Sequence, residues 1–238
     1  MTKQRPFFSY FGGKFRAAKH YPKPQYDRIV EPFAGAAGYS SNHYSKDVIL
    51  IEKDSNVASV WRWLINASAD DITSLPDLEK GQRISEVDGI PDDAKLWMGF
   101  WIGQGTQAPR DKVSTWGARC YNANLRNKIA EQLEYIKHWT IIEGDYREAP
   151  DIEATWFIDP PYSNKAGKSY RMQPGDFDEL GEWCKQRQGQ VIVCENEGAD
   201  WLPFEFLANV HSNQNNAGNS FSKEVIWHKD NSVVCDDV

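Results

Sequence analysis

Residues 156–162, with the sequence WFIDPPY, join three apolar residues to a carboxylate, two prolines and an aromatic ring. The apolar residues predict the end of a buried strand. Because proline fixes φ and has no amide hydrogen, Pro160 and Pro161 predict a stiff loop that also restricts Asp159. Ligands of open α/β sheets bind beyond the carboxyl ends of strands. The carboxylate, a backbone carbonyl without a local partner and the Tyr162 ring therefore favour a site for a flat molecule with an amino group over an ordinary strand-exit turn.

A second strand end leads into small residues. Residues 28–31 predict a short strand, and the loop PFAGAAG follows at 32–38, with a helix expected beyond it. Small residues let a ligand approach the backbone, and a helix N-terminus offers unpaired N–H groups, so this geometry commonly cradles a nucleotide. The loop is not G-x-G-x-x-G. A tight strand–helix turn is the alternative interpretation.

The next predicted strand, at 47–51, ends in acidic residues. Glu52 and Asp54 follow the glycine loop at about the 20-residue spacing at which an acid accepts hydrogen bonds from ribose hydroxyls. Asp54 alternatively caps a helix at 57–65, whose apolar residues recur at helical spacing. The two strand ends together favour a cofactor that contains adenosine.

The remaining pattern predicts an α/β fold. Strands are expected from 140, at 155–158, at 190–194 and at 224–228, with a helix at 177–185 and an exposed polar loop at 211–220. Strands that alternate with helices indicate a parallel-type, Rossmann-like sheet. Residues 66–139 lack such strands. We therefore expect one domain made of residues 1–65 and 140–238, with a mainly helical insertion at 66–139 that includes a helix at 122–139 with Leu125, Ile129, Leu133 and Ile136 on one face.

The insertion is locally basic in an acidic chain. Between positions 95 and 128 the only acidic residue is Asp111, and the aromatic residues Trp116 and Tyr121 are interleaved with six basic ones: Lys95, Arg110, Lys112, Arg119, Arg126 and Lys128. Basic side chains contact phosphates, and arginine also reads base edges. A solvated helix face with core aromatics is the alternative. The loop at 163–173 adds Lys165, Lys168 and Arg171 without an acid, which suits a phosphate clamp or a mobile lid.

The composition excludes several classes of protein. A net charge of -7 argues against a generally nucleic-acid-coating protein, although a local basic groove is compatible with it. The four cysteines form no CxxC pair and have no histidine cluster nearby, so we expect no metal site and reduced thiols in a cytoplasm. No signal peptide is recognised, and no apolar run approaches the roughly 20 residues that span a bilayer.

These motifs together match a family. The chain resembles the DNA adenine-N6 methyltransferases of the Dam type, the D12 class with a DPPY motif, which use S-adenosylmethionine. The resemblance is carried by four blocks in the expected order, FSYFGGK at 8–14, EPFAG at 31–35, DSN at 54–56 and DPPY at 159–162, with GDY at 144–146 similar to a fifth. It covers most of positions 7–162, and the last third of the chain matches only in outline.

The resemblance implies a role for each matching residue. It implies cofactor contacts for Tyr10, Lys14, Phe33, Gly35, Asp54 and Asp145, and handling of the target adenine by Asp159, Pro160 and Tyr162. It also implies a methyltransferase sheet, double-stranded DNA as partner, and a cytoplasmic protein encoded by a bacterium or phage. With DNA as partner, the basic residues noted above become the DNA-contacting candidates, which are Arg110, Lys112, Arg119 and Arg126 in the insertion and Lys165 and Lys168 in the loop at 163–173. Tyr10 stands where the family usually has Trp, and Ala37 where it usually has a second Gly, which would weaken cofactor binding or shift the loop.

Other interpretations stay open at this point. An enzyme that methylates cytosine N4 or an amino group in RNA would use the same motif, and Ala37 makes a non-catalytic DNA- or cofactor-binding relative possible. A nicotinamide-dependent oxidoreductase fits less well, because the G-x-G-x-x-G pattern is missing. The recognition sequence, a restriction endonuclease partner and the oligomeric state are left open by the sequence.

Overall fold

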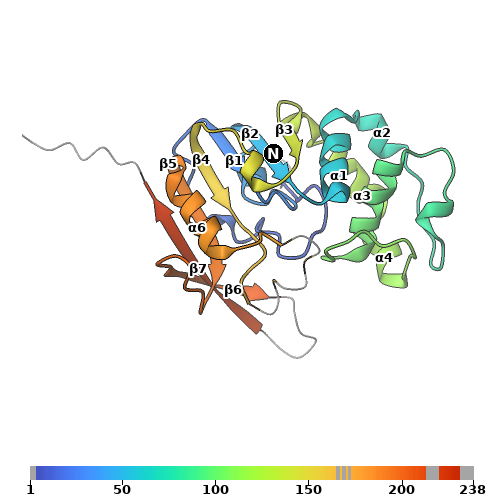
Figure 1. The fold of residues 1–238 in the computed structure, drawn as a ribbon. Helices are drawn as coiled ribbons and strands as arrows, with labels where there is room; N and C mark the ends of the chain where they lie inside the picture. The colour runs from blue at the N-terminus through green and yellow to red at the C-terminus, as the bar shows by residue number, and fades with distance from the viewer. Residues whose placement is uncertain (1–3, 165–166, 168–169, 171–172, 213–219, 231–238) are drawn as a thin grey trace, which may run out of the picture.

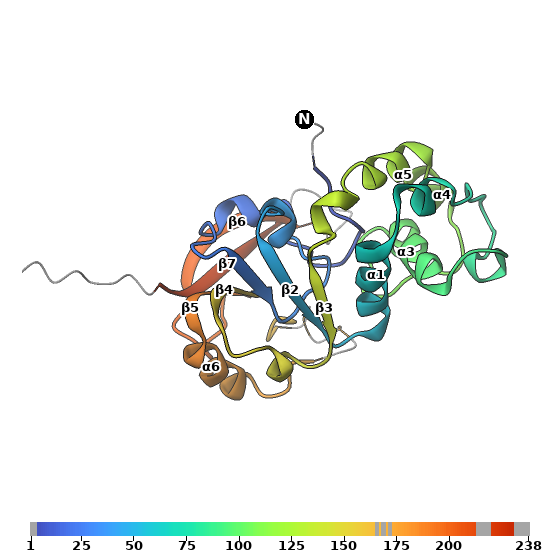
Figure 2. The same ribbon diagram turned by 90° about the horizontal axis from the view of Figure 1, so that it is seen from above.

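The protein forms an α/β fold around one mixed, mostly parallel sheet. The structure is a computed structural model, and it describes residues 4–164, 167, 170, 173–212 and 220–230. Its seven strands lie in the order β3-β2-β1-β4-β5-β7-β6 (Figures 1 and 2). Their bounds are β1 Arg28–Glu31, β2 Asp47–Glu52, β3 Thr140–Glu143, β4 Glu153–Ile158, β5 Gln188–Asn196, β6 Glu205–Ser212 and β7 Ser220–Lys229.

Strands β1 to β5 pair in parallel, and only β7 runs against its neighbours β5 and β6. From β1 the chain proceeds to β2 and β3 on one side, whereas β4 and β5 lie on the other. The strand order therefore reverses between β1 and β4, and such a switch point leaves a crevice beyond the carboxyl ends of the two strands. The fold is compatible with the expected Rossmann-like sheet.

Helices cover both faces of the sheet. Figures 1 and 2 show α6 on the β4–β5 side and the helices between β2 and β3 gathered at the other end, beyond α1. Their bounds are α1 Ser55–Asn66, α2 Ala69–Thr73, α3 Asp92–Gly103, α4 Thr115–Cys120, α5 Ala123–Ala130 and α6 Phe177–Gln186. Alternate strand residues point to opposite faces, so Ile29 joins one hydrophobic cluster and Val30 the other.

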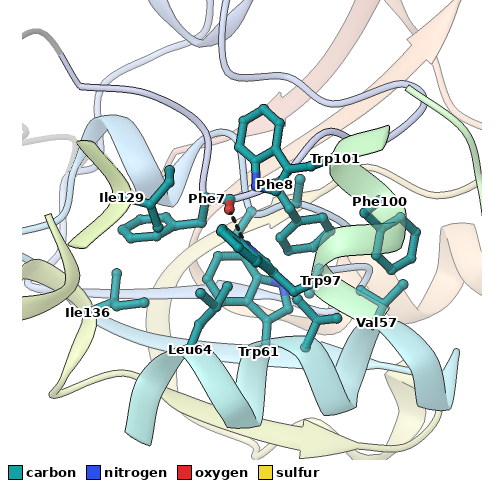
Figure 3. Close-up of a cluster of buried hydrophobic side chains, with 14 of the residues drawn as sticks. Phe7, Phe8, Val57, Trp61, Leu64, Trp97, Phe100, Trp101, Ile129 and Ile136 are labelled. Carbon is teal, nitrogen blue, oxygen red and sulfur yellow. Dashed lines mark hydrogen bonds between the residues drawn. The ribbon is translucent and has the colours of Figure 1, made fainter. Parts of the chain in front are cut away.

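Residues between α1 and β3 share a core with the sheet. Trp61 of α1 and Trp97 of α3 lie buried around the N-terminal Phe7 and Phe8, and Trp97 Nε1 donates a hydrogen bond to the Phe7 carbonyl at 2.8 Å (Figure 3). Ile129 of α5 belongs to the same cluster. Helices α2 to α5 lie where the insertion was expected. A separate recognition role for residues 66–139 stays a prediction.

Three local expectations are corrected. The small-residue loop leads into a 3-10 turn, Ser40–Asn42, and not into an α-helix. The expected helix at 122–139 is divided into α5 and the 3-10 turn Leu133–Ile136, although its four apolar residues are buried as predicted. The expected loop at 211–220 contributes its ends to β6 and β7, and residues 213–219 lie outside the described part of the chain.

Candidate active site

One large cavity opens at the carboxyl ends of β1, β2 and β4. Its volume is about 1650 Å³, above the roughly 300–1,000 Å³ of most small-molecule sites, so it has room for more than one ligand. It brings together all nine residues predicted for cofactor and target. These are Tyr10, Lys14, Phe33, Gly35, Asp54, Asp145, Asp159, Pro160 and Tyr162.

On the β4 side of the cavity, the Asp159 carboxylate holds a buried lysine. Asp159 follows β4, and Lys14 Nζ lies 2.7 Å from Asp159 Oδ1, with 8% of the lysine side chain and 20% of the aspartate side chain exposed. Lys14 Nζ also lies 4.7 Å from the centroid of the Tyr162 ring, in a cation–π position. The resemblance implied a cofactor contact for Lys14, whereas the structure pairs it with the predicted catalytic acid.

A second carboxylate, from β7, completes this cluster. Glu224 Oε2 accepts a hydrogen bond from the Tyr162 hydroxyl at 2.6 Å and lies 4.0 Å from Lys14 Nζ. Sequence analysis placed Glu224 only in a final strand. Its one available signal was a charged residue inside an apolar strand pattern.

Burial and neighbouring charges shift the pKa values of both partners of the ion pair, and at each partner the two effects oppose one another. Burial raises the pKa of Asp159 to about 6, although Lys14 opposes the shift. Burial alone would lower the pKa of the Lys14 ammonium, but the carboxylates of Asp159 and Glu224 raise it above its ordinary value. Asp159 therefore exchanges its proton near neutral pH, while Lys14 keeps its charge.

The glycine loop is held by buried hydrogen bonds. Glu31 accepts from the Ser40 N–H at 2.7 Å, and burial raises the pKa of Glu31 to about 8. A Cβ on Gly38 would lie 2.4 Å from the Phe15 nitrogen and 2.8 Å from Lys14 backbone atoms, so only glycine lets the N-terminal Gly-Gly-Lys segment pack here. Ala37, at the position where the family usually has glycine, takes a left-handed φ of 44°.

The two acids proposed for the ribose have structural partners. Glu52 accepts from the Gly35 N–H at 2.9 Å and from the Asp54 N–H at 2.8 Å, and burial raises its pKa to about 7. Asp54 caps α1 by accepting from the Asn56 N–H at 3.0 Å. The alternative role of Asp54 as a helix cap is confirmed, and its side chain also lines the cavity.

At the far end of the cavity lie an aromatic pair and a second ion-paired aspartate. Phe33 stacks on Tyr146, with ring centroids 5.4 Å apart. Asp145 lies 2.9 Å from Lys53 Nζ and 3.1 Å from Arg147 Nη1. Burial would raise the pKa of Asp145, but these two cations hold it below its ordinary value.

An aromatic wall closes the cavity on the N-terminal side. The Tyr170 hydroxyl donates to the Phe11 carbonyl at 3.0 Å, and a Cβ on Gly12 would lie 2.4 Å from that hydroxyl oxygen. The Tyr10 ring lies so close to Gly35 that a Cβ there would meet it at 3.2 Å. Tyr170 was not predicted, because nothing in the polar loop around it marks one ring as special.

The predicted DNA-contacting residues differ in their exposure to solvent. Arg110, Lys112 and Arg119 are exposed, and Trp116 between them is 62% exposed. Arg126 is buried, donates to Asp77 at 2.8 Å and lies over the Tyr121 ring, so its position argues against a phosphate contact. Lys165 and Lys168, together with Arg171, lie outside the described residues.

Basic side chains do line the cavity, but most come from the N-terminal segment. Besides the ion-paired Lys14 and Lys53, they are Arg5, Arg16 and Lys19, together with Lys128 of α5 from the basic run of the insertion. The basic residues that flank the Gly-Gly-Lys block, such as Arg16 and Lys19, were visible in the sequence. Because they were scattered, the denser basic run of the insertion drew the prediction instead.

The part of the chain that the structure describes contains neither a candidate metal site nor a candidate membrane span. Within those residues, no group of three or more histidine, cysteine, aspartate or glutamate side chains is placed to hold a metal ion. Among the described helices, none is long and apolar enough to cross a membrane.

The comparison with known proteins leaves the chain's family to be argued from its residues. No protein-family model matches the chain, and no curated protein sequence matches it.

Proposed function

We propose that this protein is a DNA adenine-N6 methyltransferase that uses S-adenosylmethionine. The observation that carries the proposal is the position of Asp159, Pro160 and Tyr162 at the end of β4, in the same cavity as the glycine loop at the end of β1. A carboxylate that faces a cofactor cradle across a strand-order switch point suits transfer to a flat amine. The family resemblance of the DPPY and Gly-Gly-Lys blocks narrows that amine to adenine N6.

The residues of the outer cavity fit an adenosyl group. Phe33 offers a ring that is already stacked and faces the cavity, and Asp145 and Asp54 offer carboxylates beside it. Gly35 has a positive φ of 45° and no Cβ, so no side chain crowds the Tyr10 ring beside the glycine loop. The cofactor supplies an electrophilic methyl group on a sulfonium, and Phe33, Gly35, Asp54 and Asp145 would hold it.

The chain's own residues would supply orientation and charge. The adenine N6 lone pair is delocalised into the ring, so the amino nitrogen is a weak nucleophile. Hydrogen bonds from this amino group to the Asp159 carboxylate and the Pro160 carbonyl would favour a pyramidal nitrogen with a directed lone pair. The carboxylate also stabilises the positive charge that develops on that nitrogen and sits beside the proton that must leave.

Tyr162 would hold the target base outside the duplex. Extrusion of a base costs a few kcal/mol, and stacking on an aromatic ring offsets part of that cost. In the structure this ring is fixed from both sides, by Lys14 over its face and by Glu224 at its hydroxyl. A ring held in this way loses little further freedom when a base stacks on it.

DNA would approach over the basic rim of the cavity. Arg5, Arg16, Lys19 and Lys128 line the cavity, and Arg110, Lys112 and Arg119 of the helical region are exposed. Such charges suit phosphate contacts, which position a protein on DNA without reading its sequence. Residues 66–139 remain our candidate for the recognition region, in a cytoplasmic enzyme of a bacterium or phage.

The test is incubation of the purified protein with labelled S-adenosylmethionine and DNA of varied sequence, followed by digestion to nucleosides. N6-methyladenosine of the deoxy series is the expected product. Label recovered at cytosine N4 would identify cytosine as the substrate in place of adenine. Label found only when RNA is supplied would identify RNA as the substrate in place of DNA. Cofactor binding without transfer to any nucleic acid would favour the non-catalytic alternative and contradict the proposal.

A further inference from the structure

Glu224 is a buried acid that the proposed reaction leaves unexplained. It lies on β7 opposite Asn196 of β5 and Ala208 of β6, with 5% of its surface exposed. Its neighbour Lys223 points the other way and pairs with Glu197 at 2.9 Å on the surface. Strand alternation therefore directs Glu224 into the cavity, where it is part of the lining.

Two phenols and one ammonium converge on a single oxygen of Glu224. Its Oε2 accepts from the Tyr162 hydroxyl at 2.6 Å and from the Tyr21 hydroxyl at 3.1 Å, and Lys14 Nζ lies 4.0 Å away. The other oxygen, Oε1, lies 3.3 Å from the Ser222 hydroxyl. A buried carboxylate persists only when donors and a counter-charge compensate its lost hydration, and this one has both.

Lys14 thus lies between two carboxylates, close to Asp159 at 2.7 Å and farther from Glu224 at 4.0 Å. In the proposed reaction an incoming amino group must donate to Asp159, whose Oδ1 is held by Lys14 in this structure. A lysine displaced from Asp159 inside a buried site would be costly without a second anion in reach. Glu224 is that anion, and it is also the acceptor that fixes Tyr162.

We propose that Glu224 is a positioning residue, which holds the Tyr162 ring in place and keeps the charge of Lys14 compensated when the target amino group occupies Asp159. The inference rests on the proposed function and deepens it. Glu224 acts through Tyr162 and Lys14, since nothing requires it to touch the reacting atoms.

The experiment compares Glu224→Gln with Tyr21→Phe. The glutamine keeps the shape and an acceptor oxygen but removes the charge, whereas Tyr21→Phe removes only one hydrogen bond to the same oxygen and leaves Tyr162 and Lys14 untouched. We expect Glu224→Gln to lower kcat by on the order of 10- to 100-fold through misplacement of the base, with the KM for DNA and the cofactor affinity unchanged. Tyr21→Phe should turn over like the wild type.

A second readout does not depend on turnover. The side-chain carboxyl carbon of Asp159 can be titrated by ¹³C NMR, with Asp159→Asn for assignment. Glu224 is one of the groups that raise the pKa of Asp159, so its neutralisation should move the titration below about pH 6. The charged and titratable groups that face Asp159 are Lys14, Glu31, Glu195, Glu224, Tyr21, Tyr162, Tyr170 and Cys194.

The outcomes separate the two proposals. A wild type that makes no methylated base sinks the proposed function, while the titration still tests whether Glu224 acts on Asp159. An unmoved titration in Glu224→Gln, or a loss of kcat that Tyr21→Phe shares equally, would mean that Glu224 only stabilises the fold and would overturn the inference.

Discussion

Two aspartates follow strands at opposite ends of one cavity, and each is paired with a lysine. The two aspartate side chains are about equally exposed, at 20% for Asp159 and 18% for Asp145, but Lys14 is buried, at 8%, whereas Lys53 is 46% exposed. Burial raises the pKa of Asp159 to about 6, while Lys53 and Arg147 keep the pKa of Asp145 below its ordinary value. An aspartate of similar exposure therefore has a raised pKa where its lysine partner is buried and a lowered pKa where two half-exposed cations flank it.

For the proposed function, this difference favours chemistry at one end of the cavity and cofactor binding at the other. A group that titrates near neutral pH suits the reacting centre, where charge develops in the transition state. A group that stays ionised suits a fixed hydrogen bond to a cofactor. The predictions that follow test whether the division holds.

Removal of the Asp159 carboxylate should have the largest effect. Asp159→Ala should lower methyl transfer by on the order of 10²- to 10³-fold, since one preorganised group at developing charge has this size of effect. Cofactor affinity, measured by calorimetry, should persist, because Asp159 lies at the other end of the cavity from Phe33 and Asp145. Normal turnover in this variant would refute the role assigned to Asp159.

The pH dependence of turnover should follow the same carboxylate. At saturating cofactor, the single-turnover rate should fall about tenfold per pH unit below about pH 6, because protonated Asp159 no longer accepts the amino hydrogen. Stability should respond with the opposite sign. The folded-state pKa lies above the ordinary value of 3.8, so folding favours the protonated form, and this residue lowers the free energy of unfolding as pH rises from about 4 to 6.

Asp159→Asn should remove that slope from denaturant titrations carried out across the same pH range. The comparison of wild type with Asp159→Asn isolates this carboxyl from Glu31 and Glu52, whose pKa values burial also raises. A rate that stays flat down to pH 5 would show that the Asp159 proton does not limit the reaction.

Loss of the Asp145 charge should act on binding alone. A hydrogen bond to a charged group contributes about 1.5–3 kcal/mol, so Asp145→Asn should weaken cofactor binding by about 10- to 100-fold in calorimetry. Turnover at saturating cofactor should stay near that of the wild type. Glu148→Ala is the matched control. It removes the other half of the same capping box but keeps the Asp145 carboxylate. A kcat that drops as far as in Asp159→Ala would erase the division between the two ends.

Sequence patterns predicted the features that neighbouring residues determine, which are the strand ends and the site residues that follow them. The strand ends at Glu31, Glu52 and Ile158 follow from apolar runs that stop at polar or small residues, and the site residues come with them. Glu224 was missed because its partners Tyr21 and Tyr162 are 203 and 62 residues away, and sheet pairing alone brings them together. Long-range pairing leaves no local periodicity to detect.

Other misses have their own physical causes. The helix expected after the glycine loop is replaced by a 3-10 turn, in which the Asn42 N–H donates to the Tyr39 carbonyl and the His43 N–H to the Ser40 carbonyl, and small residues before it do not distinguish such a turn from an α-helix. Strand β6 carries exposed Phe206 and no clean alternation, so nothing marked it. A charge count cannot detect burial, which is why Arg126 was grouped with the exposed Arg119.

Substitution of Arg119 and of Arg126 tests which of the two arginines contacts DNA. Arg119→Ala should weaken DNA binding across sequences and reduce the slope of log affinity against log salt by about 1, as the loss of one phosphate contact does. Arg126→Ala should leave that slope unchanged and lower the melting temperature, because its contacts are Asp77 and Tyr121. Fluorescence anisotropy over a salt series measures both, and an equal loss of slope in Arg126→Ala would return that residue to the DNA interface.

The smallest expected effect belongs to Ala37, in the loop that joins the two ends of the cavity. A left-handed conformation costs a residue with a Cβ roughly 1–2 kcal/mol, and Ala37 takes it with a φ of 44°. Ala37→Gly relieves that strain but loses a buried methyl group and restores freedom to the unfolded chain, so its own stability change is small. Ala36→Gly has the same losses without the relief, since φ at Ala36 is not positive. The glycine at 37 should therefore leave the protein about 1–2 kcal/mol more stable than the glycine at 36 in urea titrations. Equal stabilities would mean that the loop relaxes around Ala37, and cofactor affinity in Ala37→Gly then measures what the methyl group itself does to the cradle.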